Sequence, residues 1–305
     1  MNPSSNSSTE AADSLTPANF RSLARSISFI ENESNNYEEL LLNLKPSSAK
    51  IIGVTGAPGA GKSSLVDALI GEMISDKKKV GVICVDPSSP FNKGALLGDR
   101  IRMSQWYNHS DVFIRSLASK GSLGGLHPKI IEISDLMKSV GFDYVIIETV
   151  GVGQSEVDIA ALADITIVML VPEGGDIIQN MKAGLMEVAD IFVINKFDRP
   201  GAQNFYNSLK QMLSPAFNKI STQIPILKTI AFEKEGIPEL YKKIQEWEFD
   251  NQSVQKINLL TEKIWALIVN EKMKNFDKEK MKSEIEKAVL NPDFNIYSFA
   301  KKYAD

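Results

Sequence analysis

The chain has 305 residues, of which 43% are hydrophobic and 24% charged, a composition typical of a globular protein with a sizeable core. Its net charge of −4 argues against a protein held to nucleic acid mainly by phosphate contacts. The single cysteine, Cys84, excludes an intramolecular disulfide, and no apolar run approaches the ~20 residues that span a bilayer. We therefore expect a cytoplasmic protein that binds neither nucleic acid nor a membrane.

The chain is expected to divide into four parts. Residues 1–16 are polar and without an apolar signal core, which predicts a disordered tail. Residues 17–48 predict an N-terminal helical extension, because apolar side chains recur at three- and four-residue spacing until Pro46 breaks the pattern. Residues 49–250 predict one α/β domain, and residues 251–305 predict a second helical extension.

Within the central part, short apolar runs alternate with longer amphipathic stretches. Strands that are apolar throughout and separated by helices predict a mostly parallel sheet that is covered by helices on both faces. In chain order, the predicted strands are residues 51–55, 80–85, 112–115, 144–148, 165–171, 191–194 and 224–227.

A glycine-rich loop follows the first predicted strand and matches the pattern G-x-x-x-x-G-K-[ST] without a gap. Glycines let successive N–H groups turn toward a phosphate, Lys62 supplies a positive charge, and the Ser63 hydroxyl is placed to ligate Mg²⁺. The helix predicted over 64–74 points its positive end at the same phosphates. The predicted nucleotide contacts here are Gly56, Ala57, Pro58, Gly59, Ala60, Gly61, Lys62, Ser63 and Ser64.

Acidic residues close two predicted strands on the metal side of this loop. Asp86 follows the second strand, Asp99 lies on the next segment, and Glu148 ends the fourth strand. Together with Ser63 they offer four oxygen donors, a set that suits Mg²⁺. Three residues beyond Glu148, Gly151 can turn its N–H toward a γ-phosphate. Capping of a neighbouring helix is the alternative role for each acid.

The sequence Asn195-Lys196-Phe197-Asp198 follows the sixth predicted strand and predicts a guanine-binding loop. The carboxylate of Asp198 can accept hydrogen bonds from the ring N1–H and the exocyclic amine of guanine, whereas adenine has no N1–H. The stem of Lys196 can cover the ring, and Asn195 is expected to tie this loop to the phosphate loop. After the last strand, the remaining base-side contacts are predicted at Ile230, Ala231 and Phe232.

Three other residues with reactive side chains are expected to be structural. His109 and His127 lie in polar stretches without a second metal ligand nearby, which predicts surface or capping roles. Cys84 lies in an apolar strand and is expected in the core.

Taken together, these motifs resemble the methylmalonyl-CoA mutase-associated GTPases of the MeaB/ArgK type, within the SIMIBI class of P-loop proteins. The resemblance covers about residues 20–250, and ETVGVGQSE is its most specific motif. The matching motifs are GAPGAGKSS at 56–64, VDPSSP at 85–90, GALLGDRIRM at 94–103, GSLGGL at 121–126, ETVGVGQSEVDIA at 148–160 and NKFD at 195–198.

The resemblance implies a GTPase that acts as a chaperone of an adenosylcobalamin-dependent methylmalonyl-CoA mutase or a related acyl-CoA mutase. Such a protein would gate cofactor loading and protect or reactivate the mutase. By matching position, the switches fall near residues 86–99, 148–154 and 174–182, and the helical ends imply a homodimer. Ile230 departs from the small polar residue that is usual there.

The predicted reaction is hydrolysis of GTP to GDP and phosphate with Mg²⁺ as cofactor. Lys62 would neutralise charge on the transferring group, and Glu148 would act through the metal. Gln154 is a candidate for positioning the attacking water, and Lys182 or Arg102 for stabilising the transition state. A phosphate-transferring kinase and an assembly factor for a different enzyme are the alternatives.

Overall fold

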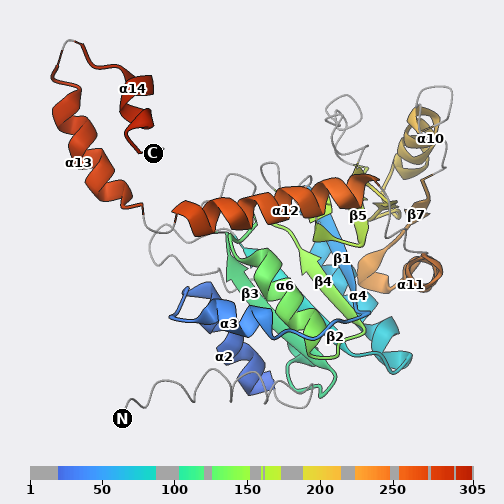
Figure 1. Ribbon diagram of the computed structural model, residues 1–305. Helices are drawn as coiled ribbons and strands as arrows, with labels where there is room; N and C mark the ends of the chain where they lie inside the picture. Colours follow the sequence, from blue (N-terminus) through green and yellow to red (C-terminus); the bar gives the residue numbers. More distant parts are fainter. Residues whose placement is uncertain are drawn as a thin grey trace. The chain divides into compact units, whose positions relative to one another are not determined.

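The computed structural model describes residues 20–86, 103–119, 126–151, 159–160, 162–172, 188–213, 224–247, 254–273, 276–291 and 293–303 (Figure 1). The predicted tail at 1–16, Asp99, Gln154 and Lys182 lie outside these residues. The chain forms two compact units, Met1–Phe249 and Asp250–Asp305.

The first unit contains a seven-stranded sheet in the order β3-β2-β4-β1-β5-β6-β7, and every described pairing is parallel. This confirms the predicted α/β fold. The strands are β1 (Lys50–Gly56), β2 (Val80–Asp86), β3 (Val112–Ala118), β4 (Tyr144–Glu148), β5 (Ile165–Leu170), β6 (Ile191–Ile194) and β7 (Ile226–Lys228).

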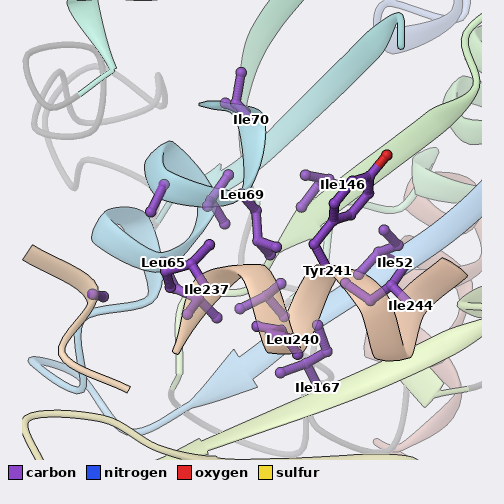
Figure 2. Packing of buried hydrophobic residues seen from close by; sticks show 14 of the residues in the cluster. Ile52, Leu65, Leu69, Ile70, Ile146, Ile167, Ile237, Leu240, Tyr241 and Ile244 are labelled. Carbon is purple, nitrogen blue, oxygen red and sulfur yellow. The ribbon is translucent and has the colours of Figure 1, made fainter. Parts of the chain in front are cut away.

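Helices cover both faces of this sheet because side chains alternate along buried strands. Ile52 packs on one face with α4 and α11, whereas its neighbour Ile51 packs on the other with α2, α3 and α6. Figure 2 shows Leu65 of α4 beside Ile237 of α11, and Ile52 of β1 beside Ile244 of α11. The helices and short 3₁₀ turns of this unit are α2 (Phe20–Glu31), α3 (Tyr37–Leu42), α4 (Lys62–Ser75), η1 (Ser104–Trp106), α6 (Ile130–Ser139), α10 (Ala202–Met212), η2 (Ala231–Glu233) and α11 (Ile237–Glu246).

The N-terminal extension is two helices where the sequence pattern predicted one helical stretch. Glu33 and Asn36 adopt the left-handed conformation, with φ of 48° and 68°, between α2 and α3. The segment between the helices carries no apolar side chain, so burial offers nothing for continuing the helix there. An ion pair of 3.0 Å between Glu31 and Arg115 of β3 ties the end of α2 to the sheet.

Three aspartates stabilise the amino-terminal edge of the sheet. Asp143, Asp164 and Asp190 each precede a strand and accept an N–H from a neighbouring chain segment, at 2.8, 2.8 and 2.7 Å. Burial raises the pKa of Asp190 to about 6, although the N–H of Thr166 opposes that rise. Because these carboxylates accept backbone N–H groups, their role is structural. The described polar residues that could bind a ligand lie at the opposite, carboxyl-terminal edge of the sheet.

The second unit consists of α12 (Val254–Met273), α13 (Lys278–Ala288) and α14 (Ile296–Lys301). Asp277 and Asn295 cap the amino ends of α13 and α14, each accepting two backbone N–H groups. The two short helices are joined by a hydrogen bond of 2.6 Å from the Tyr303 hydroxyl to Glu284. No helix in the described part of the chain is long and apolar enough to span a membrane.

Candidate functional site

The glycine-rich loop joins β1 to α4 at the carboxyl edge of the sheet. Gly59 and Gly61 adopt φ of 77° and 96°, a conformation that costs other residues energy and turns the backbone amides inward. Helix α4 begins at Lys62, directly after Gly61, so the N–H groups of its first turn face the loop. This geometry is that of an anion-binding cradle.

The side chain of Lys62 lies inside the cradle. It is only 7% exposed, and its ammonium donates hydrogen bonds to the carbonyl oxygens of Gly56 at 2.8 Å and Ala57 at 3.2 Å. The loop therefore holds the Lys62 ammonium beside its first two residues, Gly56 and Ala57. A phosphate that entered the cradle would meet this charge together with the amides of the loop.

The metal side of the site contains the next residue, Ser63. Its hydroxyl donates a 2.7 Å hydrogen bond to Glu148 at the end of β4, and both side chains are buried. Asp86, also buried, ends β2 two residues beyond the partner of Glu148 in the parallel register. These hard oxygen donors fit Mg²⁺, which keeps several of its waters and needs only one or two carboxylates. Among the described residues no group of three His, Cys, Asp or Glu forms a metal cluster.

The segment after β4 lies directly against the phosphate loop. Thr149 donates its N–H to Val54 at 3.0 Å and its hydroxyl to Thr55 at 2.9 Å. Gly151 has φ of 84°, and a Cβ placed there would lie 2.7 Å from Nζ of Lys62. Any side chain at this position would collide with the carbonyl of Gly56 and with Lys62, so glycine is required where this segment passes the phosphate loop.

The side chain of Asn195, at the end of β6, connects the phosphate loop to the base side of the site. Its amide nitrogen donates to the carbonyl of Ala60 at 2.8 Å, which is the tie that the sequence predicted. Its oxygen accepts from the Thr229 hydroxyl at 3.1 Å and from the Ala231 N–H at 3.0 Å. A Cβ on Gly61 would collide with the Asn195 amide, so glycine is required at that contact.

The other predicted base-side residues surround this connection. Lys196 adopts a left-handed φ of 57°, and the side chain of Asp198 is exposed. Phe232 is 91% exposed on η2, beside Ala231, whose N–H is given to Asn195 in this structure. The backbone of Ile230 pairs with Glu235, so the departure at this position leaves the local backbone hydrogen bonds in place.

Some contacts at the site were not predicted from the sequence. The hydroxyls of Thr229, Thr149 and Thr55 hold the loops together. Thr149 and Thr229 lie in segments that the motifs had already marked, but no contact of their hydroxyls was predicted. His127 was expected at the surface or as a cap. It is only 1% exposed, and its Nδ1 accepts the Lys129 N–H at the start of α6, so the capping role is correct and the surface position is wrong. Cys84 is buried, as predicted.

A parallel sheet with this phosphate loop, the Ser63–Glu148 contact and an Asn-Lys-x-Asp loop tied back to the cradle defines a P-loop GTPase of the SIMIBI class. The family model described as "Methylmalonyl Co-A mutase-associated GTPase MeaB" matches residues 23–285. The chain belongs to this family.

Two similar proteins and a similar crystal structure agree with this assignment. A GTPase-named protein of Pyrococcus horikoshii is 39% identical over 302 residues, 95% of each chain. The GTPase ArgK of Escherichia coli is 41% identical, covering 65% of this chain and 61% of ArgK. The crystal structure of an LAO/AO transport system kinase covers 100% of this chain and 98% of that chain, with a TM-score of 0.64 and 26% identity. The protein therefore binds GTP and GDP and hydrolyses GTP.

Proposed function

We propose that this GTPase is a chaperone of an adenosylcobalamin-dependent methylmalonyl-CoA mutase or a related acyl-CoA mutase, acting in the cytoplasm. It would gate loading of the cofactor and protect or reactivate the mutase. The observation that carries this proposal is a relative named as the fused isobutyryl-CoA mutase of Cupriavidus metallidurans. This chain is 34% identical to it over 241 residues, 75% of this chain and 22% of that protein. The family description also names a mutase.

In the proposed hydrolysis, the cradle amides and the Lys62 ammonium hold the β- and γ-phosphates and offset the charge that develops during transfer. Ser63, Asp86 and Glu148 would hold Mg²⁺, with Asp99 as a further ligand, and the ion would polarise the phosphate oxygens. Support comes from the 2.7 Å contact of Ser63 with Glu148 and the burial of both carboxylates.

Base recognition is proposed at the opposite end of the cradle. Asp198 would accept the two donors on the guanine edge, Lys196 would cover one face of the ring, and Phe232 would lie at its margin. The Ala231 amide would meet the guanine oxygen after exchanging its Asn195 partner. Support comes from the position of Asn195, which fixes this loop relative to the phosphate loop.

Partner control of the reaction is proposed to act through the segment that begins at Glu148. A Cβ at position 151 would lie 2.7 Å from Nζ of Lys62, so a partner that moves this segment would also act on the catalytic ammonium. Gln154 would then position the attacking water, and Lys182 or Arg102 would stabilise the transition state. A slow reaction of the isolated protein follows, because these groups would be complete only in the complex.

The experiment that tests this proposal measures GTP hydrolysis with and without purified methylmalonyl-CoA mutase. We expect an acceleration of about tenfold or more, because ordering one transition-state contact is worth at least that factor. The Lys62→Ala protein with the same mutase serves as the control for contaminating activity. Equal rates with and without the mutase would contradict the chaperone proposal.

A kinase remains the second candidate, because the similar crystal structure bears a kinase name. Transfer of the γ-phosphate to a protein or small molecule would use the same cradle. Following a label on the γ-phosphate separates the two reactions: hydrolysis releases all of it as inorganic phosphate, whereas a kinase leaves part of it on an acceptor. An assembly factor for a different enzyme would bind that enzyme and leave the mutase unaffected.

We also propose a homodimer formed through α12. Its apolar side chains are exposed at helical spacing, including Ile257, Ile264, Trp265 and Ile268. Such a stripe favours burial against a second copy. In light scattering the protein is expected at twice the chain mass, and the Ile264→Asp/Ile268→Asp variant at the chain mass. Ala266→Asp, on the opposite side of the same helix, is the control, and an unchanged mass of the double variant would contradict this interface.

A further inference from the structure

Phe197 occupies the middle of the proposed base loop, between Lys196 and Asp198, and is held at two points. Its N–H donates to the carbonyl of Thr229 at 3.1 Å. Its ring meets the ring of Tyr206 on α10 edge-on, with centroids 6.4 Å apart and planes at 89°. Both aromatic rings are half-buried at the carboxyl edge of the sheet.

A single ammonium group contacts both rings. Nζ of Lys228, the last residue of β7, lies 4.7 Å from the centroid of Phe197 and 4.3 Å from that of Tyr206. The same atom donates to Gln203 of α10 at 3.1 Å. A cation over an aromatic face is attracted by the ring quadrupole, so Lys228 links the base loop, α10 and β7.

Helix α10 is also attached to the sheet by Phe205 and Leu209, which are buried against Phe192. The rings of Phe197 and Tyr206 are half-buried and pack against the edge of that cluster. Together with Lys228 they form a group that we call the aromatic clamp. What the clamp fixes is the backbone next to Asp198.

The position of the Asp198 carboxylate depends on this backbone. Asn195 anchors the loop on one side, and the left-handed turn at Lys196 is closed by the Arg199 N–H to its carbonyl at 3.1 Å. Asp198 itself is exposed, so no burial fixes its direction. Phe197, the residue directly before Asp198, is held by the clamp and by its N–H to Thr229.

We propose that Lys228 and Tyr206 are positioning residues for guanine selection, acting through Phe197 to hold the Asp198 carboxylate in place. This inference rests on the proposed base-reading role of Asp198. Holding a recognition group in its bound geometry before the ligand arrives removes part of the cost of binding. Loss of the clamp should therefore weaken recognition of the base edge and leave recognition of the phosphates unchanged.

The test compares dissociation constants for GDP and IDP. IDP lacks only the exocyclic amine, from which the Asp198 carboxylate would accept a hydrogen bond. The ratio of the two constants cancels any loss of folded protein, because that loss raises both apparent dissociation constants by the same factor. For the wild-type protein we expect IDP to bind roughly tenfold more weakly or worse. In Lys228→Met and Tyr206→Leu the preference for GDP should fall about three- to tenfold, the value of the lost cation–aromatic contacts.

Conservative variants and a matched control complete the experiment. Lys228→Arg and Tyr206→Phe keep the cation and the ring and should keep the wild-type ratio, as should Lys210→Met on the exposed side of α10. An unchanged ratio in both Lys228→Met and Tyr206→Leu overturns the inference. If Asp198→Ala keeps the wild-type ratio, Asp198 does not bind the base, and the inferred role of the clamp in guanine selection is also wrong.

Discussion

The Lys62→Met variant is expected to hydrolyse GTP about 10²- to 10³-fold more slowly than the wild-type protein, a loss comparable to removing one preorganised transition-state donor. Methionine keeps most of the side-chain length and removes the ammonium that Gly56 and Ala57 now hold at 2.8 and 3.2 Å. Phosphate release under single-turnover conditions measures the effect, because it separates the chemical step from the release of GDP.

The control for Lys62→Met is Lys242→Met, on the exposed side of α11, which removes the same charge far from the cradle in sequence. Thermal unfolding of both variants shows whether the buried substitution is tolerated. A rate within about twofold of wild type would be too small for loss of a catalytic charge, and would remove Lys62 from the mechanism.

The second large effect is expected from Asp198→Asn, which should exchange guanine for xanthine. Guanine presents two donors, the N1–H and the exocyclic amine, and both match a carboxylate. Xanthine presents the N1–H beside a carbonyl oxygen, so a side-chain amide, with one acceptor and one donor, matches it instead. GDP affinity should fall about 100-fold, because charge-assisted bonds are lost and a donor faces a donor.

Isothermal titration of this variant with GDP and XDP measures the exchange. XDP should bind more tightly to Asp198→Asn than to the wild-type protein, and an Asp293→Asn variant, in the second unit, should keep the wild-type preference. Unchanged GDP affinity would show that Asp198 does not bind the base, even if the phosphate loop binds the phosphates as proposed.

Local sequence predicted the parts of this protein that depend on contiguous residues. The strands are apolar runs, and the phosphate loop is one uninterrupted motif whose glycines have a single geometric purpose, as the φ of 77° and 96° at Gly59 and Gly61 shows. The tie from Asn195 to Ala60 was also predictable, because parallel strands bring their carboxyl ends to one edge.

Pairings between distant and chemically ordinary residues could not be predicted. The base loop is clamped by Tyr206 and Lys228, neither of which belongs to a motif, and the contact of Asn195 with Thr229 joins the ends of two strands. Their partners are set by the packing of α10 and β7 against β6. The burial of His127 is of the same kind: one of its two expected roles, capping, is confirmed, but its neighbours in sequence gave no sign that it would be buried near Glu31 of α2.

Titration of the wild-type protein with GDP and ADP in the presence of Mg²⁺ tests most directly whether the phosphate cradle and the base loop act together as one site. GDP is expected to bind about 100-fold more tightly, because adenine would leave the Asp198 carboxylate facing no N1–H donor. Equal affinity for the two nucleotides would contradict such a site.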